Sequence, residues 1–300
     1  MRVSDLLMSN TYLSGIAKNK SKIDTLSKQI ANQSSILKPS DSPIGTAKIM
    51  RFESKIASTD LYLKNINSSY GFVNETIRGL ESMESEISGI LVKLTEANNA
   101  INQDHLENYA AQLDQSLDAL LTSANLSYDG KYLFGGTSHS SQPFAITADR
   151  SEVVLNSPDV SGNSNVKIGN STNLKINITG EELFGTISSD PERDIFNTII
   201  KIRDDLKNGV MPTEADVTAV DSFHKKLLNE MSDAGYIYNT LENTQSLLES
   251  QRIELESMLS TEKDIDMAKA IVDMQNYDYL LQVSYKMSAM ILPKSLLDFI

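Results

Sequence analysis

The feature that most constrains the fold is a seven-residue repeat of apolar side chains between Ile49 and Ile101. Of the sixteen positions in this repeat, only Thr59, Glu84 and Asn98 are not apolar. A strict period of seven is typical of a coiled-coil seam, and about 1.5 Å of rise per residue predicts one helix roughly 80 Å long. Such a helix indicates a rod that belongs to an assembly. The repeat consists of Ile49, Ile56, Leu63, Tyr70, Ile77 and Leu91, with Phe52, Ile66, Val73, Leu80, Ile87, Leu94 and Ile101 three residues further on.

A second heptad pattern runs from Val220 to Leu255, and amphipathic segments flank both patterns. Only an antiparallel hairpin brings the two halves together. The sequence therefore predicts a mainly α fold, a long antiparallel helical rod with a small β-rich insertion at its tip. The predicted domains are an N-terminal assembly helix (1–40), the first half of the rod (41–136), the β-rich insertion (137–192), the second half of the rod (193–262) and a C-terminal assembly helix (263–300).

Local signals predict the ends of the helices. The first helix is expected from Ser4 to Leu37, because the prolines at 39 and 43 disfavour helix in the residues before them. Ser40, Asp41 or Ser42 can cap the next helix. Further helices are expected at 105–127, from Asp194 to 208, and from Thr213, with a reversal at 101–104. Short β-type runs occupy 152–155, 165–168 and 174–178.

Composition excludes several classes of partner and chemistry. A net charge of −13 argues against nucleic acid, because phosphate binding needs clustered Lys and Arg. With no cysteine, a disulfide framework and a Cys-based metal site are excluded. No stretch reaches the eighteen or so apolar residues of a membrane span. The N-terminus has no continuous apolar core of secretory type, so any export is expected without a cleaved signal peptide.

The sequence also lacks the patterns of a catalytic site. Gly135-Gly136 is not followed by the Lys-Ser/Thr of a phosphate loop. His105, His139 and His224 lie far apart, with no carboxylate at metal-ligand spacing. No Gly-x-Ser-x-Gly elbow is present. We therefore predict a protein that is not an enzyme and that uses no cofactor or metal.

Three segments resemble the flagellins and their relatives. Residues 37–45 (LKPSDSPIG) resemble the proline-bounded corner of this family, residues 130–136 (GKYLFGG) the turn after its first rod helices, and residues 264–268 (DIDMA) a step near its C-terminus. The ends, MRVS and SLLDFI, resemble those of the hook–filament junction proteins of the family rather than those of flagellins proper. The resemblance covers about residues 1–136 and 194–300.

This resemblance implies a secreted structural subunit of the bacterial flagellum, exported unfolded through the type III apparatus with the help of a cytoplasmic chaperone. Its implied partners are copies of itself in a ring or tube, a neighbouring hook-associated junction protein, and flagellin. Two alternatives remain: flagellin itself, which copy number would distinguish, and a non-flagellar coiled-coil protein secreted by a type III system.

The residues expected to make contacts between subunits lie in the two terminal segments. Apolar stripes there exceed what one hairpin buries, so a head-to-tail assembly would supply the missing partners. The corner is expected to set the angle between the terminal helix and the rod. The expected interface comprises Leu6, Leu13, Ile16, Ile23, Ile30, Leu280, Val283, Met287, Leu296, Leu297, Phe299 and Ile300, and the corner comprises Pro39, Ser40, Asp41 and Pro43.

Overall fold

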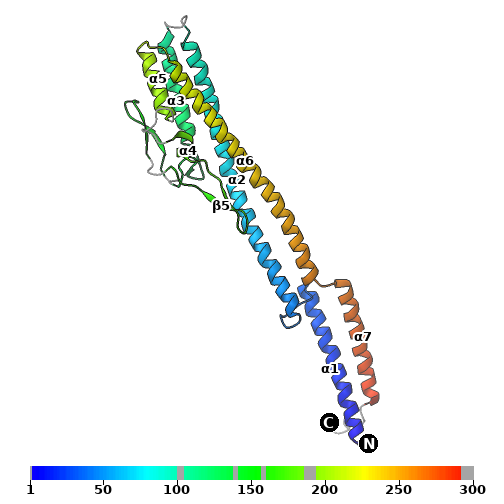
Figure 1. Ribbon diagram of the computed structural model, residues 1–300. Helices are drawn as coiled ribbons and strands as arrows, with labels where there is room; N and C mark the ends of the chain where they lie inside the picture. Colours follow the sequence, from blue (N-terminus) through cyan, green and yellow to red (C-terminus); the bar gives the residue numbers. More distant parts are fainter. Residues whose placement is uncertain (1, 100–104, 138–140, 157–159, 186–193, 292–300) are drawn as a thin grey trace. The chain divides into compact units, whose positions relative to one another are not determined.

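The computed structural model describes residues 2–99, 105–137, 141–156, 160–185 and 194–291. The chain divides into two compact units, one formed by the two terminal segments (1–58 and 250–300) and one by residues 59–249. The long helices α2 (Pro43–Ala97) and α6 (Glu214–Lys263) contribute to both units. The fold is mainly α, as predicted (Figure 1).

Helices α2 and α6 run antiparallel in the second unit and also contact each other in the first. In the second unit the ring centroids of Tyr70 and Tyr238 are 5.3 Å apart, and His224 Nε2 lies 3.1 Å from Glu84 Oε1. In the first unit, the salt bridge from Lys48 to Glu262 (3.1 Å) joins the start of α2 to the end of α6. The residue numbers fall along α6 as they rise along α2, which confirms the predicted hairpin.

The heptad seam predicted along α2 is buried at its centre and half-buried toward the start of the helix, at Ile49, Phe52 and Ile56. Ile66, Val73, Leu80 and Ile87 lie at its centre, with at most 1% of their surface exposed. Two of the three non-apolar positions fit the same interface: Thr59 is buried, and the Glu84 carboxylate meets His224 across the hairpin. The contact with His224 explains how a carboxylate occupies a seam position.

Two shorter helices complete the helical part of the second unit. Helix α3 (Leu106–Ala124) runs antiparallel to α2, since the Lys93 ammonium donates to Ser116 Oγ (2.7 Å) and the Ser82 and Ser123 hydroxyls lie 3.0 Å apart. Helix α5 (Ile195–Lys207) packs against α3. The predicted helix starts are confirmed, because Asp194 caps α5 and α6 begins directly after Thr213. The predicted reversal at 101–104 lies outside the described residues.

The segment between α3 and α5 contains three antiparallel two-stranded sheets and a short helix. The pairs are β1 (Ser127–Tyr128) with β2 (Lys131–Tyr132), β3 (Phe144–Ile146) with β4 (Val153–Leu155), and β5 (Asn165–Lys167) with β6 (Asn173–Lys175). Asp129 and Gly130 both have positive φ, as a two-residue hairpin turn requires. Strand β3 and helix α4 (Gly180–Phe184) were not predicted, and β6 ends at Lys175 rather than at Ile178.

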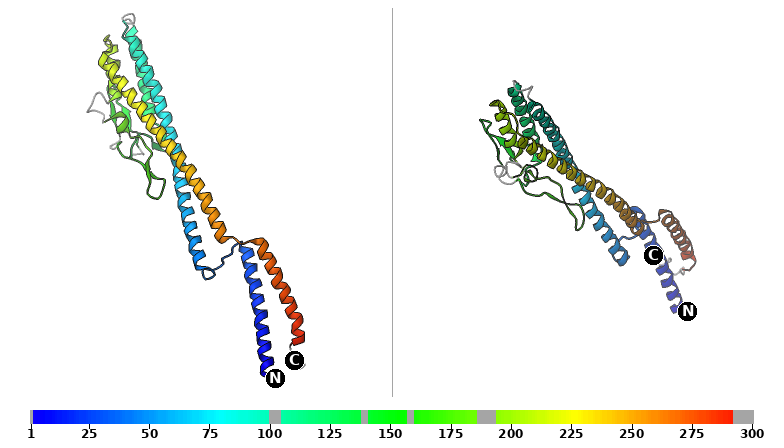
Figure 2. Two further views of the ribbon diagram at one scale, coloured as in Figure 1. Left: turned by 45° about the vertical axis from the view of Figure 1, so that its right-hand side comes forward. Right: turned by 45° about the horizontal axis from the view of Figure 1, so that its top comes forward.

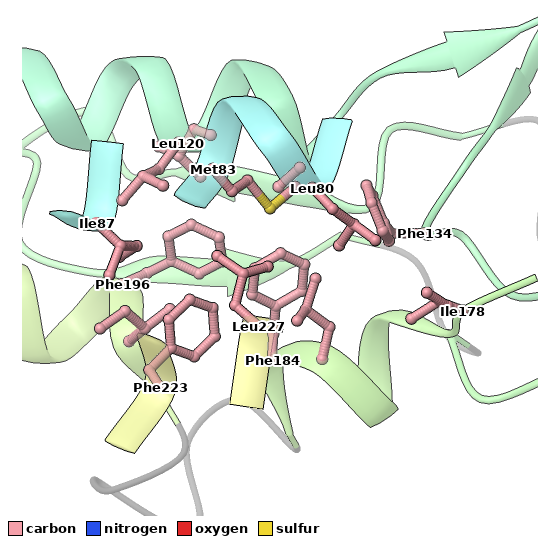
Figure 3. Close-up of a cluster of buried hydrophobic side chains, with 14 of the residues drawn as sticks. Leu80, Met83, Ile87, Leu120, Phe134, Ile178, Phe184, Phe196, Phe223 and Leu227 are labelled. Carbon is pink, nitrogen blue, oxygen red and sulfur yellow. The ribbon is translucent and has the colours of Figure 1, made fainter. Parts of the chain in front are cut away.

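The inserted segment shares one hydrophobic core with the helices. Phe184 of α4 lies 4.8 Å from Phe144 of β3, 4.9 Å from Phe196 of α5 and 6.0 Å from Phe223 of α6, measured between ring centroids. Figure 3 shows Phe184, Phe196 and Phe223 among Leu80 and other apolar side chains of the rod helices. The insertion therefore holds the second unit together and is not a separate layer on its surface.

The first unit pairs α1 (Arg2–Asn32) with α7 (Met267–Ile291), and both views show them side by side (Figures 1 and 2). The Tyr12 hydroxyl donates to the Ser284 carbonyl, so these helices are also antiparallel. The expectation that the first helix continues to Leu37 is wrong. The helix ends at Asn32 because Gln33 adopts a left-handed conformation (φ 54°) and the Ser35 N–H donates to the Lys263 carbonyl at 2.7 Å.

Candidate assembly surface

The inner side of α1 faces α7. Its half-buried residues recur every three or four positions, which is the spacing of one helical face. Helix α7 is the element against which α1 makes its extensive contacts. Most of the apolar stripe of α1 is therefore covered within the chain. The half-buried positions are Ser9, Tyr12, Ile16, Asn19, Ile23, Leu26, Gln29 and Ile30.

Helix α7 carries apolar side chains on two sides. One side packs against α1 and includes Ala270, which is 4% exposed, and the half-buried Met274 and Leu281. The other side leaves Tyr279 66% exposed and Leu280 47% exposed. A helix that is apolar on more than one side normally lies inside a protein. The described residues leave the second side of α7 uncovered.

The first unit buries little in its described residues. Only Ser34, Gly45, Leu255 and Ala270 are buried in its described part. Burial of apolar surface is the main favourable term in folding, at about 25 cal/mol per Å². A two-helix unit with so few buried side chains gains little stability by itself and leaves much apolar surface for other contacts.

The residues expected at the interface have three different environments. Leu13, Leu280 and Met287 are exposed, and Val283 is half-buried. Ile16, Ile23 and Ile30 lie on the face of α1 that packs against α7. The side chains of Leu6, Leu296, Leu297, Phe299 and Ile300 lie outside the described part of the structure.

At the corner, the residues around the prolines form a capped helix start. Ser42 Oγ accepts a hydrogen bond from the Gly45 N–H (3.1 Å), and Pro43 is the first residue of α2. Proline suits this position because its missing N–H would have had no partner in the helix. Of the three candidate caps, Ser42 thus fills the role. Asp41 instead accepts hydrogen bonds from the Leu37 and Lys38 N–H groups, at 3.1 and 2.9 Å.

The segment that connects α1 to α2 lies against the segment that connects α6 to α7. Ser34 forms an isolated antiparallel bridge with Asp264, and the Ser35 hydroxyl also reaches the Lys263 carbonyl at 3.1 Å. Asp266 then caps α7, since its carboxylate accepts from the Lys269 N–H at 3.0 Å. Asp264 and Asp266 therefore have local structural roles at the start of α7.

Charged groups in the second unit join the insertion to the helices. The buried Arg203 of α5 donates to Asp114 of α3 (2.9 Å) and to the Arg150 carbonyl (2.8 Å), and Arg150 also pairs with Asp118. Burial acts to raise the pKa of Asp114, but the hydrogen bonds from Arg203 and Arg150 outweigh it and hold that pKa below its usual value. This network stabilises the fold and provides no reactive group.

Glu230 of α6 has the opposite environment. Burial raises the pKa of its carboxyl above the usual value, and the charges of Glu182 and Asp233 raise it further. Lys226 and Lys175 act in the other direction but do not cancel the effect. The stability of the folded state should therefore depend on the protonation of Glu230, and so on pH.

The described residues contain no group of three His, Cys, Asp or Glu side chains placed to hold a metal ion. Among the same residues, every helix is too short or too polar to span a lipid bilayer.

Comparison with known proteins identifies the family. The bacterial flagellin N-terminal helical region matches residues 3–139, and the bacterial flagellin C-terminal helical region matches residues 217–300. Flagellar hook-associated protein 3 of Salmonella typhimurium is 21% identical over 312 residues, which cover 95% of each chain. FlgL of Bacillus cereus (20% identity, TM-score 0.58) matches 70% of this chain and 99% of its own. The flagellar junction protein FlgL of Legionella pneumophila (14% identity, TM-score 0.58) matches 74% of this chain and all of its own. The two flagellin regions together span most of the sequence, so the chain belongs to the flagellin family of flagellar structural proteins.

Proposed function

We propose that this protein is the structural subunit that joins the flagellar hook to the flagellin filament. The observation that carries the proposal is the exposed apolar side of α7 in a terminal unit with few buried residues. A relative along 95% of the chain is named flagellar hook-associated protein 3, which favours the junction over the filament. The function is structural and not enzymatic.

A subunit that lies between hook and filament contacts proteins on both sides, and these are its proposed partners. Copies of the chain form a ring or tube, a second hook-associated protein lies on the hook side, and flagellin lies on the other side. Apolar surface of this extent on a free chain is an aggregation hazard. A cytoplasmic chaperone that covers the terminal segments until export would prevent this aggregation. The chain is then located outside the cell on the flagellum, exported without a cleaved signal peptide.

We assign the contacts between subunits to the two terminal segments, 1–40 and 263–300. The exposed Leu13, Leu280 and Met287 are the best supported of these contacts, together with Val283. The tail from Leu296 to Ile300 and the side chain of Leu6 are assigned to the same interface from sequence. Residues Pro39 to Pro43 set the direction in which the chain leaves α1 for α2.

Copy number tests this function against the alternative that the chain is flagellin, whose N- and C-terminal helical regions it shares. Hook-attached filaments are sheared to different mean lengths and separated from the released fragments, and the ratio of this chain to the main filament protein in the hook-attached fraction is measured by quantitative mass spectrometry. A junction protein is present in a fixed number per flagellum, so the ratio should rise as the filaments become shorter. A ratio that stays constant with length, or this chain as the most abundant protein, would refute the junction.

Loss of the gene gives a second test. A strain without the protein should make hooks, export flagellin into the medium and carry no filaments. Filaments of normal length in that strain would contradict the proposal.

A further inference from the structure

We propose that proton uptake by Glu230 of α6 strengthens the docking of the neighbouring part of the insertion, so that this part opens less often in mild acid than at neutral pH. The part concerned is strand β6 with the first turn of α4, residues 173–182, here called the docking segment. The response is local to the second unit, and it is independent of the place of the protein on the flagellum.

Glu230 occupies a seam position of α6. Phe223 precedes it by seven residues and Ile237 follows it by seven, so all three lie on one side of the helix. Phe223 and Ile237 are buried, and Glu230 is half-buried. A carboxylate therefore lies among apolar side chains on the inner side of α6.

The docking segment lies against this side of α6. Thr179 and Glu182 of the segment line one surface cavity with residues of α6, Phe223 among them. Just beyond the segment, the Phe184 ring stacks on the Phe223 ring, with 6.0 Å between their centroids. Glu230 follows Phe223 by about two helical turns on the same side. The segment can thus move away from α6 while Phe184 stays in the core.

A second carboxylate in the seam, Glu84 of α2, has a partner that Glu230 lacks. Glu84 Oε1 lies 3.1 Å from His224 Nε2 across the hairpin. Burial and surrounding charges act on Glu230, with no hydrogen bond from any described residue. Six residues along each helix from the contact at His224, Arg78 of α2 lies at the level of Glu230. The Arg78 guanidinium, however, pairs with Glu75 at 2.9 Å.

The group of the docking segment that faces Glu230 is the Glu182 carboxylate. It accepts hydrogen bonds from the Thr179 N–H at the start of α4 (3.0 Å) and from the Lys175 ammonium of β6 (2.6 Å). Burial acts to raise the pKa of Glu182, but these hydrogen bonds outweigh it and hold that pKa below its usual value. Glu182 therefore stays charged over the pH range in which Glu230 takes up a proton.

The remaining charges around Glu230 lie on α6 and β6. Asp233 of α6 disfavours the charged form of Glu230, as Glu182 does, whereas Lys226 and Lys175 favour it. Burial has the largest effect and also disfavours the charged form. A charged Glu230 thus repels the carboxylate that joins β6 to α4, and proton uptake removes this repulsion.

The sign of the pH dependence follows from the raised pKa of Glu230 in the folded state. The stability that proton uptake contributes is fully present below 4.5, and it is lost as the pH rises through the folded-state pKa. Moving the docking segment away from α6 returns Glu230 to water without separating α2 from α6. We therefore expect the opening of residues 173–182 to increase over this pH range, while the centre of the rod stays closed.

Hydrogen–deuterium exchange with mass spectrometry measures this opening in the full chain. Exchange is followed between about pH 4 and pH 8, and the rates are corrected for the intrinsic pH dependence of amide exchange. Peptides from 173–182 report the docking segment, and peptides from 63–80 of α2 report the rod. Glu230→Gln removes the charge at nearly the same size, and Glu230→Leu places an apolar side chain in the seam. Glu242→Gln, at an exposed position of α6, is the matched control.

In the natural protein, protection of 173–182 should fall several-fold from the acid to the neutral end of the series. Glu230→Gln should keep the acid value throughout, and Glu242→Gln should follow the natural protein. Glu230→Leu should also be independent of pH, which keeps the test valid if the Gln variant folds poorly. Undiminished pH dependence in both Glu230 variants would overturn the proposal. So would an equal loss of protection in the α2 peptides, or pH independence in Glu242→Gln.

Discussion

Replacing Phe184 by Ala should destabilise the second unit strongly, because this ring connects the insertion to the rod helices. Phe184 contacts the rings of Phe134, Phe144, Phe196 and Phe223, with centroid distances between 4.8 and 6.1 Å. Only 1% of its surface is exposed. The ring is thus close to the centre of the core that Figure 3 shows.

Removal of a buried Phe side chain typically costs about 3–5 kcal/mol, as lost transfer free energy plus the energy of the cavity left behind. Rings packed around Phe184 on several sides cannot all move into the space, so we expect the upper half of this range. For a domain of this size each kcal/mol lowers Tm by about 2–4 °C, which predicts a fall of roughly 10 °C or more. Urea titration followed by far-ultraviolet circular dichroism measures the free energy of unfolding directly.

Leu155→Ala is the matched control within the same insertion. The Leu155 side chain is 36% exposed at the end of β4, so its removal should cost about 0.5 kcal/mol. If Phe184→Ala cost less than 1 kcal/mol, or no more than Leu155→Ala, the insertion would not share the core of the rod, and the reasoning would be wrong.

Three further changes test separate parts of the structure. Gly136→Ala should lower the free energy of unfolding by at least about 1–2 kcal/mol in urea titration, because φ is 60° and an added Cβ would lie 2.7 Å from a backbone atom. The control is Gly89→Ala in α2, where an added Cβ meets nothing within 4 Å. That change should be neutral or stabilising. Glu230→Gln should raise the free energy of unfolding at pH 7. Because the pKa of Glu230 is raised in the folded state, protonation of this carboxyl stabilises the fold below pH 4.5, and that stabilisation is lost as the pH rises through the folded-state pKa. The advantage of the variant over the natural protein should therefore disappear when the pH falls below 4.5. Ser42→Ala removes the cap of α2 and should lower the stability of its first turn by about 1 kcal/mol. Amide hydrogen exchange in that turn should become faster. Unchanged exchange would show that the cap is not needed.

The pairing of the long helices can be predicted from the sequence, because the period of the apolar residues shows which side of each helix is buried. A seam of period seven must face a partner along its length, which is why the pairing of α2 with α6 could be predicted before any contact was known. The starts of α5 and α6 could also be predicted, because capping by Asp194 and Thr213 is a local property.

What could not be predicted depends on contacts between residues far apart in sequence. The end of α1 at Asn32 follows from pairing of Ser34 and Ser35 with Lys263 and Asp264, which no local pattern reveals. Nor does the sequence show that Phe184 meets rings from three other elements, and a five-residue helix such as α4 is too short to have a recognisable period.

The candidate assembly surface could be predicted from the sequence only in part. The apolar stripes of both terminal helices could be found, but their spacing does not say which stripe the hairpin itself covers. Packing of α1 on α7 covers Ile16 and Ile23 partly and leaves Tyr279 and Met287 exposed. A helix pair must be seen in three dimensions before its inner and outer sides can be distinguished.

The position of the protein along the flagellum tests the central proposal most directly. Isolated hook–filament complexes are labelled with gold-conjugated antibody against residues of the insertion and viewed by electron microscopy. We expect gold at a single site, where hook and filament meet, and none along the filament. Gold distributed along the filament would show that the chain is a filament subunit, and would contradict the assignment to the junction.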